Sequence, residues 1–388
     1  MNASLAPMKI GITCHPTYGG SGAVATELGI ALAARGHEVH FVTYRQPFRL
    51  PSFLPRVYFH EVDVGSYPLF EYPPYDLALA VRMYDVVRAH HLDLLHCHYA
   101  IPHATSAWIA RQMLHDKGED TALVTTLHGT DITLVGQDPS FHSIAKFSIE
   151  RSDQITAVSQ YLKAETFNAF QCTSCRVNVI YNFIDPTIYN RAAYPPDLRQ
   201  QFNGDRAIIM HVSNFRPVKR IRDVVRIFAK VQAERPAALI MVGDGPDRGL
   251  AEEEARVLGI EGSVHFLGKI DNVAPLMASA DLFLLPSQSE SFGLGALEAL
   301  ASGVPVIASD AGGLREVVKH GETGLLYPVG DVDAMGAGAL EILRDRDRHA
   351  AMSAAAEHDA RARFSLDTIV SQYEALYRTA LHQRSDTP

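Results

Sequence analysis

The sequence contains little cysteine and no long apolar run. Only four of its 388 residues are cysteines, too few for a disulfide framework in a chain of this length. No stretch of about 18 consecutive apolar residues occurs, and the first residues lack the charged and apolar regions of a signal peptide. We therefore expect no membrane-spanning helix and a cytoplasmic location.

An excess of positive charge is also missing. The chain has 35 Lys and Arg against 44 Asp and Glu, a formal net charge of −9, which argues against nucleic acid or an anionic membrane as the main partner. Any bound anion must then be held by a local site. Since 388 residues exceed what one hydrophobic core usually holds, we expect two domains. Self-association into a homo-oligomer stays open.

The closely spaced pair Cys172 and Cys175 matches neither a metal motif nor a redox motif well. A structural zinc site needs four ligands, and the sequence has no second such pair. Redox C-x-x-C motifs open a helix after a strand, whereas this pair leads from a predicted helix into a strand. We expect ordinary loop cysteines.

Short apolar runs alternate with helical patterns through most of the chain. Those of the first half are MKIGITC, EVHFVTY, LDLLHCHY, ALVTTLHG, QITAVS and RVNVIYNF. Those of the second half are RAIIMHVSNF, AALIMVGDG, SVHFLG, ADLFLLPS, PVIASD and GLLYPVG. Near-continuous apolar strands separated by helices imply parallel sheets covered on both faces. The sequence therefore predicts an α/β protein with two doubly wound domains.

The domain boundary is expected near residues 184–206, which lack periodicity and carry three prolines. We place the first domain at 1–185 and the second at 186–365. The segment 366–388 has apolar residues at helical spacing, and we expect this helix to pack back on the first domain. Ligands of such sheets bind beyond the carboxyl ends of the strands, so the glycine-rich turns there should line the site.

The first such turn is HPTYGGSGAVATELG, where Gly19, Gly20 and Gly22 let the backbone approach a ligand. The helix behind it offers free N–H groups and a positive dipole end. The turn does not match G-x-G-x-x-G, and the next strand ends in Arg45 instead of an acidic residue that binds a ribose. An NADP-dependent oxidoreductase and a simple tight turn both stay open.

The second turn, ESFGLGALEALASG, carries two carboxylates. Glu290 precedes a helix expected to start near Phe292, and Glu298 lies in its second turn. Carboxylates accept hydrogen bonds from sugar hydroxyls, and glycine-turn amides donate to phosphate. The combination suits a nucleotide diphosphate sugar.

A basic stretch, HVSNFRPVKRIRD, follows the first strand of the second domain. A solvated first helical turn explains Arg220 and Arg222. It explains Arg216 and Lys219 less well, because cations at a helix N-terminus oppose the helix dipole. We expect Arg216 and Lys219 to reach a diphosphate.

The E-x₇-E spacing of Glu290 and Glu298, followed by FGLGALEALASGVPVIAS, resembles the signature of retaining glycosyltransferase family 4. MVGDGP at 241–246 and the turn around Lys219 agree with it. The resemblance runs from Lys9 to about residue 375. It implies the GT-B fold, in which two Rossmann-like domains face each other across a cleft.

The resemblance also implies residue roles. Glu290 would bind the sugar hydroxyls, and Glu298 the ribose hydroxyls. The diphosphate would be bound by Arg216, Lys219 and the amides of Phe292, Gly293 and Leu294. Gly20 would approach the diphosphate from the opposite domain. His128, in LHGTD, would lie near the sugar C6 hydroxyl. The expected catalytic residues are Glu290, His128, Arg216 and Lys219.

Stretches of the N-terminal half resemble one member type of this family, among them GITCHPTYGGSGAVATELG, LHCHYAIPHA, TTLHGTDITLVG and IYNFID. This resemblance implies UDP-N-acetylglucosamine as donor and L-malate as acceptor, in the first step of bacillithiol biosynthesis. The acceptor positions that match are Ser21, Tyr99, Thr130 and Lys146. Two malate carboxylates need donors and at least one cation, which these residues supply.

Several alternatives remain open at this stage. They are another retaining family member with a different small polar acceptor, a nicotinamide-dependent oxidoreductase, and a non-catalytic nucleotide-sugar sensor. We see no unambiguous general base in the sequence, so the leaving phosphate oxygen is expected to take the acceptor proton. Positioning and electrostatic stabilisation would then supply most of the rate.

A metal site is not expected. The histidines around LHCHYAIPHA are His90, His91, His96, His98 and His103. His96 and His98 share a strand face, but no carboxylate or cysteine on that face completes a ligand set, so core positions are favoured. Asp331 and Asp333 form a D-x-D that we expect to cap a helix. We expect neither a metal nor another cofactor.

Overall fold

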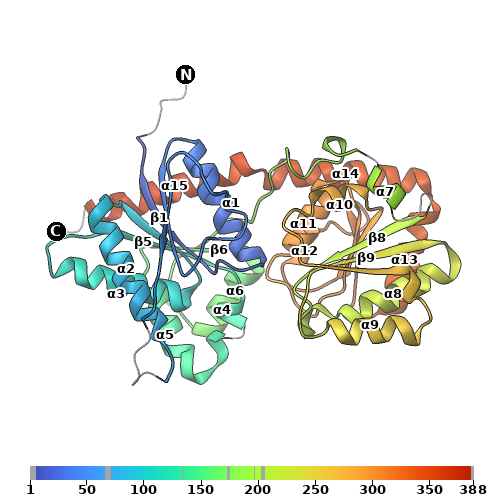
Figure 1. Ribbon diagram of the computed structural model, residues 1–388, viewed down its shortest axis with the longest axis horizontal. Helices are drawn as coiled ribbons and strands as arrows, with labels where there is room; N and C mark the ends of the chain where they lie inside the picture. Colours follow the sequence, from blue (N-terminus) through green and yellow to red (C-terminus); the bar gives the residue numbers. More distant parts are fainter. Residues whose placement is uncertain are drawn as a thin grey trace. The chain divides into compact units, whose positions relative to one another are not determined.

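The computed structural model describes residues 6–65, 71–133, 135–172, 175–195, 197–201 and 206–385 (Figure 1). The chain divides into two compact units, Met1–Tyr181 with Ile369–Pro388, and Asn182–Thr368. The sequence placed this boundary a few residues later, at 185. Residues 1–5 of the predicted first domain and residues 386–388 of the predicted last segment lie outside the described residues.

The first unit is built on a seven-stranded sheet in the order β3-β2-β1-β4-β5-β6-β7, and all its pairings are parallel. Its strands are β1 (Lys9–Thr13), β2 (Glu38–Thr43), β3 (Val57–Glu61), β4 (Leu94–His98), β5 (Ala122–Leu127), β6 (Gln154–Ala157) and β7 (Val177–Val179). Its helices are α1 (Gly20–Ala34), α2 (Tyr75–His90), α3 (Thr105–His115), α4 (Thr130–Thr133), α5 (Pro139–Glu150) and α6 (Gln160–Phe170), with short turns at Ala100–Ala104 and Val135–Gln137.

Helix α15 (Leu366–Ser385) belongs to the first unit from Ile369 onward. Tyr373 and Tyr377 of this helix are buried, and the Tyr377 hydroxyl lies 2.8 Å from Nδ1 of His96 in β4. Burial of two large aromatic side chains contributes several kcal/mol of hydrophobic free energy, about 1.5–3 kcal/mol each. The last helix of the chain is therefore part of the core of the first unit.

The second unit has a six-stranded sheet in the order β10-β9-β8-β11-β12-β13, again parallel throughout. Its strands are β8 (Ala207–Val212), β9 (Ala237–Val242), β10 (Val264–Gly268), β11 (Leu282–Leu285), β12 (Val306–Ser309) and β13 (Gly324–Tyr327). Its helices are α7 (Asp197–Gln201), α8 (Ile221–Glu234), α9 (Arg248–Val257), α10 (Ala274–Ser279), α11 (Leu294–Ala301), α12 (Leu314–Val317), α13 (Val332–Arg344) and α14 (Arg346–Phe364), with short turns at Arg191–Ala193, Pro217–Lys219 and Glu261–Ser263.

The predicted fold class, an α/β protein with two doubly wound parallel sheets, is confirmed. Every apolar run assigned to a strand contains one, but β3 was missed. Its residues VYFHE are half-exposed on the edge of the sheet, so the strand has no continuous apolar run. Figure 1 shows helices on both faces of each sheet. None of the described helices is both long and apolar enough to cross a membrane.

The strand order places the functional loops. In the first sheet the chain order reverses between β1 and β4, and in the second sheet between β8 and β11. Such switch points are where loops diverge and leave room for a ligand in open α/β sheets. The glycine-rich turns found in the sequence follow β1 and β11, so each unit carries one of them at its switch point.

Cys172 and Cys175 are joined as a disulfide, with their Cα atoms 5.7 Å apart. They lie in the connection between α6 and β7. Since the two sulfurs are bonded to each other, neither is a thiolate ligand for a metal.

Candidate active site

The turn between β11 and α11 is shaped by glycines. Gly293 caps the helix with a φ of 99°, and a Cβ there would lie 2.6 Å from Leu314 Cδ2. A Cβ on Gly313 would lie 2.3 Å from the carbonyl oxygen of Ser291, because the Gly313 amide donates to the carbonyl of Glu290 at 2.8 Å. α11 begins at Leu294, two residues after the predicted start. The first amides of a helix have no intrahelical acceptor, so they are available to a ligand.

Glu290 lies on this turn and is held by two donors. Lys219 Nζ donates to its Oε1 at 2.6 Å, and the Ser287 hydroxyl donates to the same oxygen at 2.8 Å. The Glu290 side chain is 11% exposed and that of Lys219 is 21% exposed. The two sequence candidates therefore form one partly buried ion pair that joins the loops after β8 and β11.

His211, at the end of β8, supports the same junction, and the sequence reasoning missed it. Its Nδ1 lies 2.8 Å from the carbonyl oxygen of Leu284 in β11, and its Nε2 lies 2.7 Å from the Ser213 hydroxyl. A carbonyl only accepts, so Nδ1 carries the proton and donates. Burial, with Lys219 nearby, lowers the pKa of His211 to about 4. The ring is neutral and connects the two strands that carry the site.

The GDGP motif packs directly against the backbone of the loop after β8. A Cβ on Gly243 would lie 1.8 Å from the carbonyl oxygen of Ser213, and one on Gly245 would lie 2.1 Å from that of Asn214. Backbone at this distance tolerates only glycine at both positions. The motif thus lets the two loops pack together, next to Arg216 and Lys219.

The four cations of this loop separate into two groups, as the sequence suggested. Arg220 pairs with Asp223 at 2.6 Å, and Arg222 pairs with Glu254 at 2.5 Å. Arg216 is exposed and has no ion pair within the described part of the chain. Among these four cations, Arg216 alone has no ion pair with another described residue.

Glu298, in the second turn of α11, is buried with 5% of its surface exposed. The hydroxyl of Tyr189, itself buried, donates to Glu298 Oε1 at 2.6 Å. Tyr189 lies 109 residues away in sequence, and no local pattern pointed to it. Charge-assisted hydrogen bonds of this length are strong and orient a carboxylate.

In the first unit, the loops after β1, β4 and β5 converge. The Tyr99 hydroxyl donates to Ser21 Oγ at 3.0 Å, and the Tyr99 ring lies 5.3 Å from that of His128. Tyr99 has a φ of 96°, a strained conformation for a non-glycine residue. Gly22 is required where it stands, because a Cβ would lie 2.6 Å from the carbonyl oxygen of His15. Three sequence candidates, from loops far apart in the chain, are brought together here.

His128 is kept neutral, and Asp131 beside it was missed. Burial lowers the pKa of His128 to about 3, and its Nε2 lies 2.8 Å from His98 Nδ1. Burial raises the pKa of Asp131 to about 6, although the amides of Gly129 and Ala100 donate to it at 2.9 and 3.3 Å. These bonds connect the loop after β5 to the loop after β4. The aspartate of LHGTD was the available sequence signal.

The remaining first-unit candidates lie on three helices. Gly20 is the exposed first residue of α1, and Thr130 is the half-buried first residue of α4. Lys146 lies on α5, where its Nζ is 3.9 Å from Glu150 Oε1 one turn further along the helix. The structure thus holds Lys146 in an exposed ion pair.

The signals that the sequence analysis discounted have structural roles. His96, His98 and His103 are completely buried, as expected of core positions. Asp331 caps α13 by accepting a hydrogen bond from the Ala334 amide at 3.0 Å. His90 does not belong with the β4 histidines, because the end of α2 carries it to another part of the sheet.

Known proteins match this arrangement over nearly the whole chain. A model of Glycosyltransferase Family 4 matches residues 18–188, and one of glycosyl transferases group 1 matches residues 197–359. The N-acetyl-alpha-D-glucosaminyl L-malate synthase of Bacillus anthracis is 48% identical over 96% of this chain and 97% of its own length. A D-inositol 3-phosphate glycosyltransferase of Thermobispora bispora is 28% identical over 94% of this chain and 91% of its own.

Solved structures agree on the fold. Sucrose-phosphate synthase from Thermosynechococcus elongatus superposes with a TM-score of 0.78 at 24% identity, covering 97% of this chain and all of its own. HepE from Anabaena, in complex with UDP and glucose, superposes with a TM-score of 0.76 at 23% identity, covering 95% and 98%. The fold is that of the GT-B glycosyltransferases. The chain belongs to glycosyltransferase family 4 and is a transferase. The oxidoreductase alternative is thereby rejected.

Proposed function

We propose that this protein transfers N-acetylglucosamine from UDP-N-acetylglucosamine to the hydroxyl of L-malate, with retention at the anomeric carbon. The observation that carries the proposal is the 48% identity to an L-malate synthase over nearly the full length of both chains. The product would be the first intermediate of bacillithiol biosynthesis, made in the cytoplasm. The runner-up is transfer to another small polar acceptor.

The donor would be held by the second unit. The Lys219 ammonium and the unpaired Arg216 guanidinium would bind the diphosphate, together with the free amides at the start of α11. Glu290 would accept hydrogen bonds from the sugar hydroxyls, since both of its present contacts fall on Oε1. Glu298, oriented by Tyr189, would accept from the ribose hydroxyls.

The acceptor would be held by the first unit. The hydroxyls of Ser21, Tyr99 and Thr130 would donate to the malate carboxylates. Lys146 would leave Glu150 to supply the cation, which costs little because an exposed i,i+4 pair is worth only about 0.3–0.5 kcal/mol. Gly20 lets a diphosphate approach the start of α1 closely.

The acceptor proton would pass to the donor itself. The bond from the anomeric carbon to the UDP oxygen breaks, a bond to the malate hydroxyl oxygen forms on the same face, and the hydroxyl proton moves to the departing phosphate oxygen. His128 is poorly suited as general base, because the conjugate acid of a base at neutral pH should have a pKa near the working pH, and that of His128 is about 3. Arg216 and Lys219 would stabilise the negative charge that develops on the diphosphate.

The test is incubation with UDP-N-acetylglucosamine and either L-malate, D-malate or succinate. We expect UDP release and a glycosylated product by mass spectrometry with L-malate, and none with succinate, which has both carboxylates but no hydroxyl to attack. Release only with a different acceptor would support the runner-up. Tight UDP binding without turnover over a broad acceptor panel would support a nucleotide-sugar sensor. The proposed reaction uses no metal, so activity should persist in EDTA at room temperature.

A further inference from the structure

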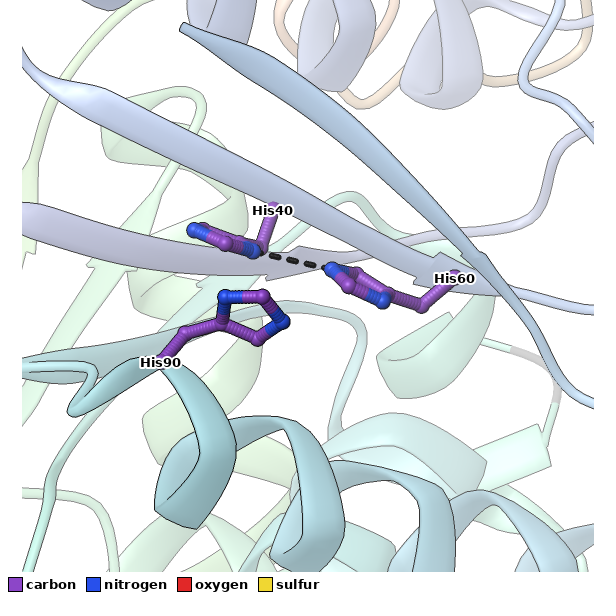
Figure 2. Close-up of side chains that lie close together, drawn as sticks. All are labelled: His40, His60 and His90. Carbon is purple, nitrogen blue, oxygen red and sulfur yellow. Dashed lines mark hydrogen bonds between the residues drawn. The ribbon is translucent and has the colours of Figure 1, made fainter.

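Three histidines converge on one face of the first sheet, at a place that the transfer reaction does not use. His40 projects from β2, His60 from the neighbouring strand β3, and His90 is the last residue of α2 (Figure 2). One ring nitrogen of each lies within 4.8 Å of those of the other two. The ring centroids are 5.1 Å apart for His40 and His60, 4.5 Å for His40 and His90, and 5.1 Å for His60 and His90.

The hydrogen bonds of His40 show which of its ring nitrogens carries the proton. Its Nε2 lies 3.0 Å from Glu38 Oε1, so Nε2 carries the proton and donates to the carboxylate. Nδ1 then has a lone pair, and it lies 2.8 Å from His60 Nε2. A carboxylate that orients a histidine through its second nitrogen is the usual outer partner of a metal-binding imidazole.

We propose that His40, His60 and His90 bind one Zn²⁺ ion, with solvent in the fourth position and Glu38 as the outer partner of His40. Zinc binds imidazole nitrogens at about 2.0–2.1 Å in tetrahedral geometry, which places ligand nitrogens about 3.4 Å apart. The facing nitrogens of His40 and His60 are 2.8 Å apart, and one nitrogen of each ring lies within 4.8 Å of those of the other two, so ring rotations can bring all three to this spacing. On binding, the His60 proton that points at His40 would move from Nε2 to Nδ1 of the same ring, and the ion would take its place at Nε2.

The charged groups around the three histidines favour a bound cation on balance, and solvent can reach the cluster. The hydrogen bond to Glu38 leaves the Nδ1 lone pair of His40 directed at the other rings of the cluster. Glu38 and the negative end of the α2 dipole attract a cation. Lys9 opposes it, although its ammonium is turned to the carbonyl of His90 at 3.0 Å and to Glu38 at 3.6 Å.

Arg82 also lies close enough to His60 to oppose a cation. His60 and His90 are half-buried, so solvent and an entering ion can reach them. A fully exposed cluster would lack the orienting contacts, and a fully buried one would lack access.

The position of the cluster indicates a structural role. Glu38 and His40 lie within β2, His60 is the fourth of the five residues of β3, and His90 ends α2. None of them lies in the loops after β1, β4 and β5, which carry the candidate active-site residues of this unit. The ion would link the half-exposed edge strand β3 to β2 and α2. A ligand that binds only the folded state raises stability by mass action.

The experiment uses the tag-free, full-length protein after EDTA treatment and dialysis. Zn²⁺ affinity and stoichiometry are measured by competition with a chromogenic chelator, and Co²⁺ serves as a visible probe of tetrahedral geometry. We expect one ion per chain, and at least a ten-fold loss of affinity in His60→Gln and in His90→Gln. Glu38→Gln should lose about ten-fold, the usual effect of removing an outer partner.

The matched control is His91→Asn. His91 is the neighbour of His90 and is exposed, with a φ of 54° that asparagine tolerates. Zn²⁺ should raise the melting temperature of the wild type and of this control, but not of His60→Gln. Stoichiometric binding that survives in both His60→Gln and His90→Gln would place the ion elsewhere and overturn the proposal. Binding only at millimolar concentration would mean an adventitious ion and would overturn it equally.

Discussion

Replacing Lys219 by methionine removes the cation that contacts Glu290. Their charged groups are 2.6 Å apart, with side chains 21% and 11% exposed. A hydrogen bond to a charged group contributes about 1.5–3 kcal/mol when buried, and the partial exposure argues for the lower part of this range. We expect Lys219→Met and Glu290→Gln each to lower the free energy of unfolding by about 1.5–2 kcal/mol.

The double variant separates this pair from general destabilisation. With both charges removed, no unpaired charge is left in the partly buried turn, so the double variant should lose less than the sum of the two single losses. A coupling energy of about 1–2 kcal/mol is expected from urea unfolding, because the groups are in direct contact. Losses that add to within about 0.5 kcal/mol would refute the idea that the two side chains act as one unit.

The same variant tests the donor assignment through ligand binding. Lys219→Met should weaken UDP at least ten-fold, the equivalent of about 1.4 kcal/mol, and should leave uridine unchanged because uridine has no diphosphate. Lys230→Met is the matched control, since Lys230 lies on α8 in an exposed pair with Asp333. Equal losses for UDP and uridine, measured by calorimetry, would contradict a phosphate contact.

Three further substitutions have distinct expected outcomes. Tyr189→Phe removes the donor to Glu298 and should weaken UDP about ten-fold, whereas Tyr194→Phe, a half-buried tyrosine nearby, should not; calorimetry with UDP distinguishes them. Tyr99→Phe should raise the KM for malate several-fold with little change in UDP affinity, measured by steady-state kinetics. Asp131 has a pKa raised from 3.8 to about 6 in the folded protein, so its contribution to stability is present below pH 4 and is lost as pH rises through 6. Relative to the wild type, Asp131→Asn should therefore gain up to about 3 kcal/mol between pH 4 and pH 7; a pH-independent difference in urea unfolding would contradict this.

Local features of the chain were sufficient for the architecture and for much of the candidate site. Continuous apolar runs predict buried parallel strands because both faces of such a strand are covered. Glycines mark turns because, without a Cβ, they adopt a positive φ at little cost, as Gly293 does with a φ of 99°. The spacing of Glu290 and Glu298 is likewise contained in nine consecutive residues. A wrong or missing element arose where this local pattern is weak, as in the half-exposed strand β3.

Contacts between distant segments were decided only by the tertiary structure. His211 bridges β8 to β11 because strands far apart in sequence become neighbours in the sheet. Tyr189, in a turn, reaches Glu298 of α11 across 109 residues of sequence. The sequence grouped His90 with the histidines nearest to it in the chain, but β3 pairs with β2 and α2 returns beside them. Side-chain periodicity specifies which face of an element is buried, whereas the partner on that face depends on strand order, and strand order is a property of the whole fold.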